Sequence, residues 1–304
     1  MKKITSFFLC FLLVFGLGFF WHQATAGFRL HKISFDLPLE EKWATTKKME
    51  DQILSILNQD FYYLNKGRQT FVFESSDHQY VIKFFRYHLV KPRLWLHFPW
   101  GLKGAEAYRQ RRIKNKRGQF EQWMDSYTLA YKHLQKTSGL VYIHLVKTDI
   151  FHKNLRVFDN LKRGYFIDLD TTGFLIQKKA TLFSKKVKEL IEKKEISSLK
   201  RLLHAYLLVL ADRNHKGIKN KDHSWLKNYG CIGLDEVYEI DSGRYSFVPP
   251  ASTKEALFSH LLSYTTHFRN YLVETCPEII PFFEKEADRV AQATFQEGLL
   301  CDTF

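Results

Sequence analysis

Polar and hydrophobic residues alternate in several short stretches of the first half of the chain. These stretches are residues 71–75, 79–85, 140–146, 155–159 and 164–170. Alternation with a period of two is typical of strands, and the polar turn Ser-Ser-Asp-His between the first two stretches predicts a hairpin. We therefore expect a small, mainly antiparallel sheet, with one helix at residues 121–134.

The second half follows a helical spacing from Lys185 onward. Residues 198–213 are strongly apolar and predict a buried helix. Two short strand patterns follow in residues 229–240. Two more helices are expected after them, because a capping-box sequence begins at Ser252 and Pro277 suits the first turn of a helix.

An apolar segment opens the chain. Two lysines precede a hydrophobic run from Ile4 to Trp21, and the small residues Ala-Thr-Ala follow at 24–26. This order is typical of a signal peptide, yet a run of about 18 residues is also nearly long enough to span a bilayer. Residues 1–26 are therefore expected to be a signal peptide or a membrane anchor. The protein would then be exported or membrane-anchored, on a side of the membrane that the charges do not fix.

The chain is strongly basic. It has 46 Lys and Arg against 32 Asp and Glu, which gives a net charge of +14 over 304 residues. With 45% hydrophobic residues it can bury a large core, which excludes a disordered protein. Residues 86–118 contain ten Lys and Arg and one acid, Glu106. The interleaved aromatic residues are Trp95, Phe98, Trp100 and Tyr108.

Two interpretations of this basic segment stand side by side. Aromatic rings beside cations suit the surface of an anionic membrane, whereas a solvated basic insertion whose rings pack on the sheet explains the same residues. No nucleic-acid module is visible, so nucleic acid is not an expected partner.

Other site chemistry has little support in the sequence. The cysteines Cys10, Cys231, Cys276 and Cys301 show no CxxC spacing, so neither a disulfide scaffold nor a zinc site is expected. Asp168 and Asp170 lie two apart on an expected strand, an arrangement that can hold a metal-bound nucleotide sugar. A strand that runs into a turn explains this pair as well.

One short motif lies at the predicted hairpin. Residues 64–72, LNKGRQTFV, keep Leu64, Gly67 and Val72 of a glycine-rich loop pattern. After the hairpin turn, YVIK ends at Lys83 on the second strand. A long cation on a rigid strand can meet phosphate oxygens with little loss of entropy.

A second set of motifs lies in the helical half. NKDHSWLKN contains Asp222 and Asn228, and Asn228 precedes Asp241 of EVYEIDSGRY by thirteen residues. Two strand patterns fill this interval. Asp241 stands where a strand pattern ends in Ser-Gly, which by itself is also a good turn sequence.

The order and spacing of these motifs resemble the protein-kinase-like superfamily, in particular its bacterial, small-molecule and lipopolysaccharide kinase branches. The resemblance covers roughly residues 60 to 300 and implies a two-lobed α+β fold after the N-terminal apolar helix. The implied segments are residues 1–26, an extension with a helix at 27–59, a small lobe at 60–180 with a basic insertion at 86–118, and a helical lobe at 181–304.

The resemblance also implies an ATP- and magnesium-dependent phosphotransferase with a lipid, saccharide or protein acceptor. Its residues would be Gly67, Val72 and Lys83 at the nucleotide, Asn228 and Asp241 at the metal, Asp222 as catalytic base, and Asp125 as partner of the lysine. Asp222 and Asn228 lie six apart, where the family pattern has five. A catalytically inactive member that docks on a membrane or protein partner is the alternative.

Overall fold

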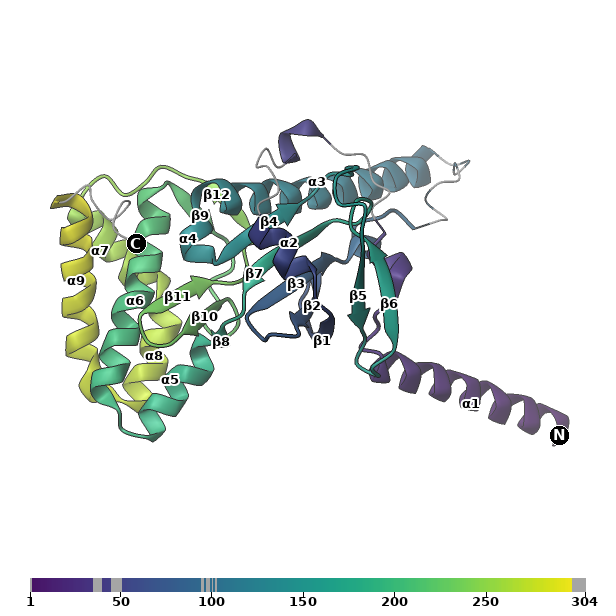
Figure 1. Ribbon diagram of the computed structural model, residues 1–304, viewed down its shortest axis with the longest axis horizontal. Coiled ribbons are helices and arrows are strands. Elements are labelled where there is room, and N and C mark those ends of the chain that lie inside the picture. Colours follow the sequence, from purple (N-terminus) through teal and green to yellow (C-terminus); the bar gives the residue numbers. More distant parts are fainter. Residues whose placement is uncertain are drawn as a thin grey trace. The chain divides into compact units, whose positions relative to one another are not determined.

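The computed structural model describes residues 2–34, 40–44, 51–93, 96, 99, 101 and 103–296. Within them the chain is a mixed α+β protein, as predicted (Figure 1). It divides into two compact units, of which unit 1 comprises residues 1–117 and 144–176, and unit 2 comprises residues 118–143 and 177–304. Expectations for Trp95, Phe98, Trp100 and Cys301 lie outside the described residues.

A seven-stranded sheet has the strand order β4-β7-β3-β2-β1-β5-β6. Its members are β1 (Phe61–Lys66), β2 (Thr70–Ser75), β3 (Tyr80–Phe85), β4 (Leu140–His144), β5 (Asn154–Phe158), β6 (Gly164–Asp168) and β7 (Phe174–Lys178). Strands β1, β2 and β3 are antiparallel, whereas β1 and β5 run parallel. The predicted strands are confirmed, but the sheet is larger and more mixed than expected.

The alternation of polar and hydrophobic residues does not predict two strands of this sheet, β7 and β1. Four of the five residues of β7 are buried, so its side chains do not alternate between apolar and polar. In β1 only Phe61 is buried, and the strand carries a bulge between Tyr63 and Asn65. Neither strand therefore shows a period of two.

The β2–β3 hairpin gives unit 1 its core. Phe71 lies opposite Phe84, and Phe73 lies opposite Ile82, so these four buried side chains share one face. Phe28 packs edge-on against Phe71 and Phe73, with ring centroids 5.3 and 5.1 Å apart. The segment before residue 33 therefore covers this face of the hairpin.

The remaining elements of unit 1 are helical and short, apart from the first. They are α1 (Lys2–Ala24), η1 (Leu30–Lys32), η2 (Glu41–Trp43), α2 (Asp51–Leu57) and η3 (Tyr87–Leu89). The end of α1 contacts the β5–β6 turn, where Asn160 Nδ2 donates to Ala24 O at 3.0 Å and Arg163 stacks on Trp21.

The expected membrane anchor is not found. In the part of the chain that the structure describes, no helix is both long and apolar enough to cross a membrane. A span needs about 20 predominantly apolar residues, and the apolar run from Ile4 to Trp21 is followed by His22 and Gln23. The prediction of a membrane-anchored protein is therefore wrong, and the predicted export gains no support.

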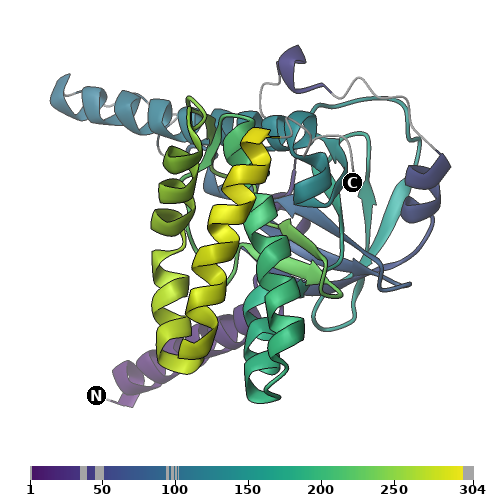
Figure 2. The same cartoon turned by 90° about the vertical axis from the view of Figure 1, so that its left-hand side faces the viewer.

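Unit 2 consists mainly of helices, with one small sheet of three strands and another of two strands. Its elements are α4 (Gln135–Ser138), β8 (Thr181–Leu182), α5 (Phe183–Glu192), α6 (Ile196–His215), β9 (Ile218–Asn220), β10 (Tyr229–Ile232), β11 (Glu236–Glu239), β12 (Tyr245–Phe247), α7 (Lys254–Tyr264), α8 (Thr266–Thr275), η5 (Pro277–Ile279) and α9 (Ile280–Gln296). Helices α6, α7 and α9 lie side by side (Figures 1 and 2). The predicted helix at 198–213 and both predicted strands are confirmed.

One helix differs clearly from its prediction. Helix α3 (Lys103–His133) begins eighteen residues before the expected 121–134. Its first half is mostly exposed and rich in Ala, Arg, Gln and Lys, which favour helices without producing an apolar stripe. A hydrophobic period therefore could not reveal it, and much of the basic segment is helical.

Candidate functional site

The predicted metal and catalytic residues of unit 2 lie in loops between short strands. Strand β9 pairs with β12, and β10 pairs with β11. The loop from β9 to β10 carries Asp222 and Asn228, and the connection from β11 to β12 carries Asp241. Gly217 opens this region with a φ of +64°, and a Cβ there would lie 2.8 Å from Val248 O, so only glycine fits the turn.

Asn220 links these loops. Its Oδ1 accepts from Asp222 N at 2.9 Å, and its Nδ2 donates to Glu239 Oε1 at 2.7 Å and to Asp241 O at 3.4 Å. The side chain is fully buried. The side-chain amide of Asn220 therefore connects the backbone at Asp222 to the backbone at Asp241. We call Asn220, Asp222, Asn228 and Asp241 the loop site.

Asn228 closes the loop from the other side. Its Nδ2 donates to Asp222 O at 3.0 Å, and its own backbone O accepts from Ile240 N at 2.7 Å. The bond to Asp222 fixes which end of the amide is the oxygen, and among the described residues no hydrogen bond to this Oδ1 is found.

Asp241 is exposed, and the turn that follows it is fixed by α3. Its Oδ1 accepts from Gly243 N at 3.3 Å. Ser126 of α3 donates its hydroxyl to Ser242 O and accepts from Tyr245 N at 2.6 Å. Burial raises the pKa of Tyr127 well above its usual range, and the Asp241 charge raises it further. The carboxylate therefore stays available on a rigid turn.

A buried ion pair lies behind Asn220, and sequence reasoning missed it. Arg213 of α6 binds both oxygens of Glu239 through Nη1, at 2.6 and 2.7 Å, and each residue is 1% exposed. Tyr229 and Tyr264 also bind this guanidinium through their hydroxyls. Burial alone would lower the pKa of Arg213, but the Glu239 charge raises it well above its ordinary value. The pair is therefore charged.

The sequence indicates one member of this pair, Arg213, but not its partner. Arg213 ends the apolar segment 198–213, where a charged residue needs a partner once it is buried. The partner, Glu239, follows 26 residues later on a strand, so no helical or strand spacing connects the two. Only the packing of α6 on β11 brings them together.

The predicted nucleotide residues belong to unit 1. Val72 and Lys83 are direct cross-strand neighbours in β2 and β3, so their side chains lie on the same face. Gly67 lies in the turn between β1 and β2, and its N donates to Thr70 O at 2.9 Å. A Cβ at Gly67 would meet Thr70 at 3.7 Å, an ordinary contact. The hairpin therefore does not require glycine at this position.

The predicted lysine partner, Asp125, lies on α3 in the part that belongs to unit 2. Its side chain is exposed, and Ser126, which holds the turn after Asp241, follows it directly. Its role toward Lys83 stays a prediction.

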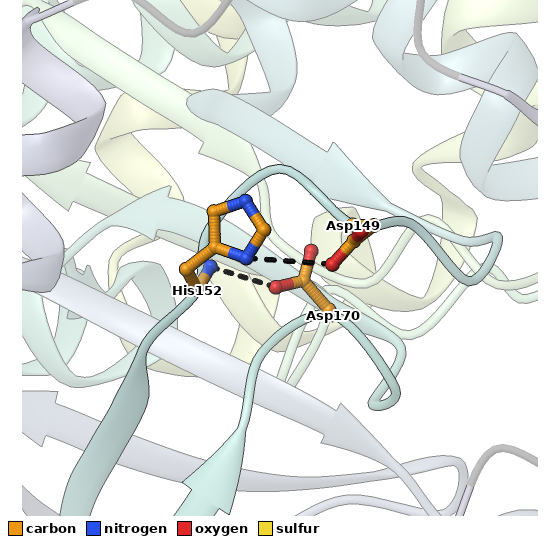
Figure 3. A group of neighbouring side chains, drawn as sticks. All are labelled: Asp149, His152 and Asp170. Carbon is orange, nitrogen blue, oxygen red and sulfur yellow. Dashed lines mark hydrogen bonds and ion pairs between the residues drawn. The ribbon is translucent and has the colours of Figure 1, made fainter.

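Unit 1 contains a group of possible metal ligands, Asp149, His152 and Asp170 (Figure 3). Asp149 and His152 are exposed. Both oxygens of Asp170 already accept hydrogen bonds, whose donors are the Thr148 hydroxyl and the backbone N–H groups of residues 150, 151 and 152. Burial would raise the pKa of Asp170, but these bonds hold it far below its usual range. The Asp170 carboxylate therefore holds the loop of residues 148–152 in place.

Asp168 and Asp170 do not lie on one face of a strand. Strand β6 ends at Asp168, so the alternation that would place both on one face stops there. Asp168 is exposed and accepts from Asp170 N at 3.0 Å, whereas Asp170 is buried. The strand running into a turn explains the pair.

Two cysteines have described side chains, Cys231 and Cys276, and both are free and buried. Burial raises the pKa of the Cys231 thiol to about 11, which disfavours the reactive thiolate at neutral pH.

In chemical terms the loop site offers hard oxygen ligands and one further carboxylate. Magnesium prefers carboxylate and carbonyl oxygens, which Asp241 and the amide of Asn228 can supply. Asp222 is half-buried, and its Oδ1 accepts from Ser224 N at 3.3 Å. No family model matches this chain, and no curated protein matches it. The argument for a function therefore depends on the residues themselves.

Proposed function

We propose that this protein is an ATP- and magnesium-dependent phosphotransferase of the protein-kinase-like type. The supporting observation is the loop site, in which Asn228 is anchored through its amide nitrogen and presents an oxygen that no described group occupies. Phosphoryl transfer depends mostly on positioned charges and metal ions. A rigid amide oxygen and an exposed carboxylate are the ligands such a metal needs.

Each residue of the loop site has a distinct role in this proposal. Asp241 and Asn228 would hold magnesium, which would neutralise negative charge on the nucleotide phosphates. Asp222 accepts the proton of the acceptor hydroxyl. Asn220 contacts neither metal nor substrate, and it positions Asp222 and Asp241 through its hydrogen bonds.

The resemblance also assigns roles to the hairpin of unit 1. Lys83 would contact phosphate oxygens of a nucleotide, and Val72, its cross-strand neighbour, would cover the base. Gly67 lies at the tip of the preceding turn. The acceptor is a lipid, saccharide or protein hydroxyl.

A nucleotide-binding protein without transferase activity is the second candidate. The extra residue between Asp222 and Asn228 favours it, because the loop is longer than the family pattern. The hydrogen bond from Ser224 N also occupies one oxygen of Asp222. Such a protein would present its nucleotide-bound surface to a partner.

Nucleotide binding tests both candidates together. The full chain is titrated with ATP in the presence and absence of magnesium, and the unfolding temperature is followed. We expect a rise that needs both ATP and magnesium and that Asp241→Asn removes. Asp235→Asn is the matched control, because it neutralises an exposed aspartate of the same unit outside the loop site. A rise of equal size in Asp241→Asn would overturn the proposal.

Turnover then separates the two candidates. A transferase releases ADP in the presence of its acceptor, and slowly with water, and Asp222→Asn should reduce this rate by about 100-fold or more while nucleotide binding persists. Magnesium-dependent ATP binding with an ADP release that Asp222→Asn leaves unchanged favours the binding protein.

A further inference from the structure

Four cations of unit 1 gather around one short turn. Lys66 Nζ donates to Ala26 O at 2.9 Å, Lys32 Nζ donates to Gly27 O at 2.6 Å, and Arg29 Nη1 donates to Phe28 O at 2.6 Å. These acceptors are the carbonyl groups of three consecutive residues. Three positive charges therefore lie along one turn of backbone.

The fourth cation, Arg86, approaches from the hairpin. Its guanidinium lies 5.2 Å from the centroid of the Phe71 ring, and Phe28 packs on the same ring. Its Nη1 donates to Gly67 O at 2.9 Å, and its Nε is buried without a hydrogen-bond partner. We call Arg29, Lys32, Lys66 and Arg86 the cationic cluster.

No carboxylate balances this cluster within the described residues. The four cations of the cluster donate hydrogen bonds to backbone carbonyls and to the Thr25 hydroxyl. Asp159 reaches the same segment through Tyr165, which packs on Phe28, but its carboxylate is bound by Arg163. Burial lowers the pKa of Lys32, and the charges of Arg29, Arg86 and Lys66 lower it further.

Unbalanced like charges cost stability unless an anion joins them. The backbone turn that gathers them is strained at Ala26, whose φ of +49° lies in the left-handed region that favours glycine. Gly27 follows with a φ of +71°, which suits glycine, and a Cβ there would lie 2.5 Å from the His22 ring. Strain and repulsion are both maintained at one place, which is typical of a binding site.

We propose that the cationic cluster is a binding site for a phosphate group, carried by a small phosphate monoester. Arg and Lys donors held by backbone carbonyls are preorganised for a compact dianion. The site is independent of the proposed transferase site. Phe71 and Phe28 mark the cluster's face of the hairpin, and strand alternation places Val72 and Lys83 on the other face.

Inorganic phosphate is the probe for this site. The full chain without nucleotide or magnesium is titrated by calorimetry with phosphate, and with chloride at equal ionic strength. We expect phosphate binding that chloride does not reproduce, and that Lys32→Gln weakens on the order of tenfold. Lys153→Gln is the matched control, because Lys153 Nζ also binds a neutral oxygen, Asn58 Oδ1 at 2.8 Å, but lies outside the cluster.

Two further variants separate this site from the nucleotide site. Lys83→Met should leave phosphate binding unchanged, and Lys32→Gln should leave magnesium-dependent ATP binding unchanged. Phosphate binding that is lost in Lys83→Met but kept in Lys32→Gln would place the anion at the nucleotide site and overturn the inference. Equal affinity in the wild type, Lys32→Gln and Lys66→Gln would overturn it as well, whatever the outcome for ATP.

Discussion

The loop site of unit 2 and the cationic cluster of unit 1 both hold charged side chains in place, but different groups surround them. Behind the loop site, Arg213 and Glu239 neutralise each other in the core. Asn220 connects this pair to the loops, because its amide donates to Glu239 and to Asp241 O and accepts from Asp222 N. The cationic cluster has only carbonyl acceptors and one hydroxyl among the described residues.

This difference separates two ways of building a site. In unit 2 the charge that would be costly to bury is already paired, so the loops above it are rigid before a ligand arrives. In unit 1 the charges repel each other until a ligand arrives. The first arrangement should lose stability when a charge is removed, and the second should gain it.

The largest effect is expected at the buried pair. Glu239→Gln leaves the Arg213 charge buried without its counter-ion, and Nε and Nη2 of this guanidinium already lack partners. Breaking a buried pair in this way should lower the free energy of unfolding by about 3–5 kcal/mol. Urea unfolding of the full chain measures this change.

The control for this experiment is on the same strand. Glu236 begins β11, its side chain is half exposed, and Glu236→Gln should change the free energy of unfolding by less than about 1 kcal/mol. Combining Glu239→Gln with Arg213→Met removes both charges and should recover part of the loss. Equal losses for the two glutamate variants would show that the pair does not brace unit 2.

The sequence singles out Asp222, Asn228 and Asp241 by their order and spacing, and their roles stay predictions. It does not reveal the network behind them. Asn220 lay within the same quoted motif, but its role depends on side-chain bonds to Glu239 and Asp241. Those bonds exist only after β9, β11 and the turn have packed, so no spacing rule reveals them.

The cationic cluster could not be predicted from the sequence. Its members range from Arg29 to Arg86, and the positive charge of the chain draws attention to residues 86–118 instead. What gathers the cluster is a turn with positive φ at Ala26, a residue that rarely adopts this conformation. Composition therefore located the excess of charge, and only tertiary structure located the site.

An intermediate effect is expected from pH near the cluster. Burial lowers the pKa of His88 to about 4, with further lowering from Arg86, Lys32 and His31. The unfolded chain, with a pKa near 6.5 for histidine, then binds more protons than the folded chain between these values, so stability should fall as pH drops from about 6.5 to about 4.

His88→Gln isolates this contribution. The variant should show a shallower loss of unfolding temperature than the wild type across that range, because its side chain does not titrate. Phosphate should also reduce the loss in the wild type, since an anion beside Arg86 and Lys32 favours the protonated ring. If the unfolding temperatures of His88→Gln and of the wild type fell equally with pH, His88 would not be the group that causes the loss.

The smallest effect tests whether removal of one charge from the cationic cluster raises the stability of the protein. Lys32→Gln removes one of the mutually repelling charges while an amide N–H can still donate to Gly27 O. At low salt and without phosphate, the variant should be more stable than the wild type by about 0.3 kcal/mol or more for each repulsion removed. The gain should disappear at about 1 M salt, where the Debye length is about 3 Å. Lys153→Gln, which breaks no repulsion within the cluster, should show no such gain. A loss of stability in Lys32→Gln at low salt would mean that an acid balances the cluster after all, and the contrast between the two units would not hold.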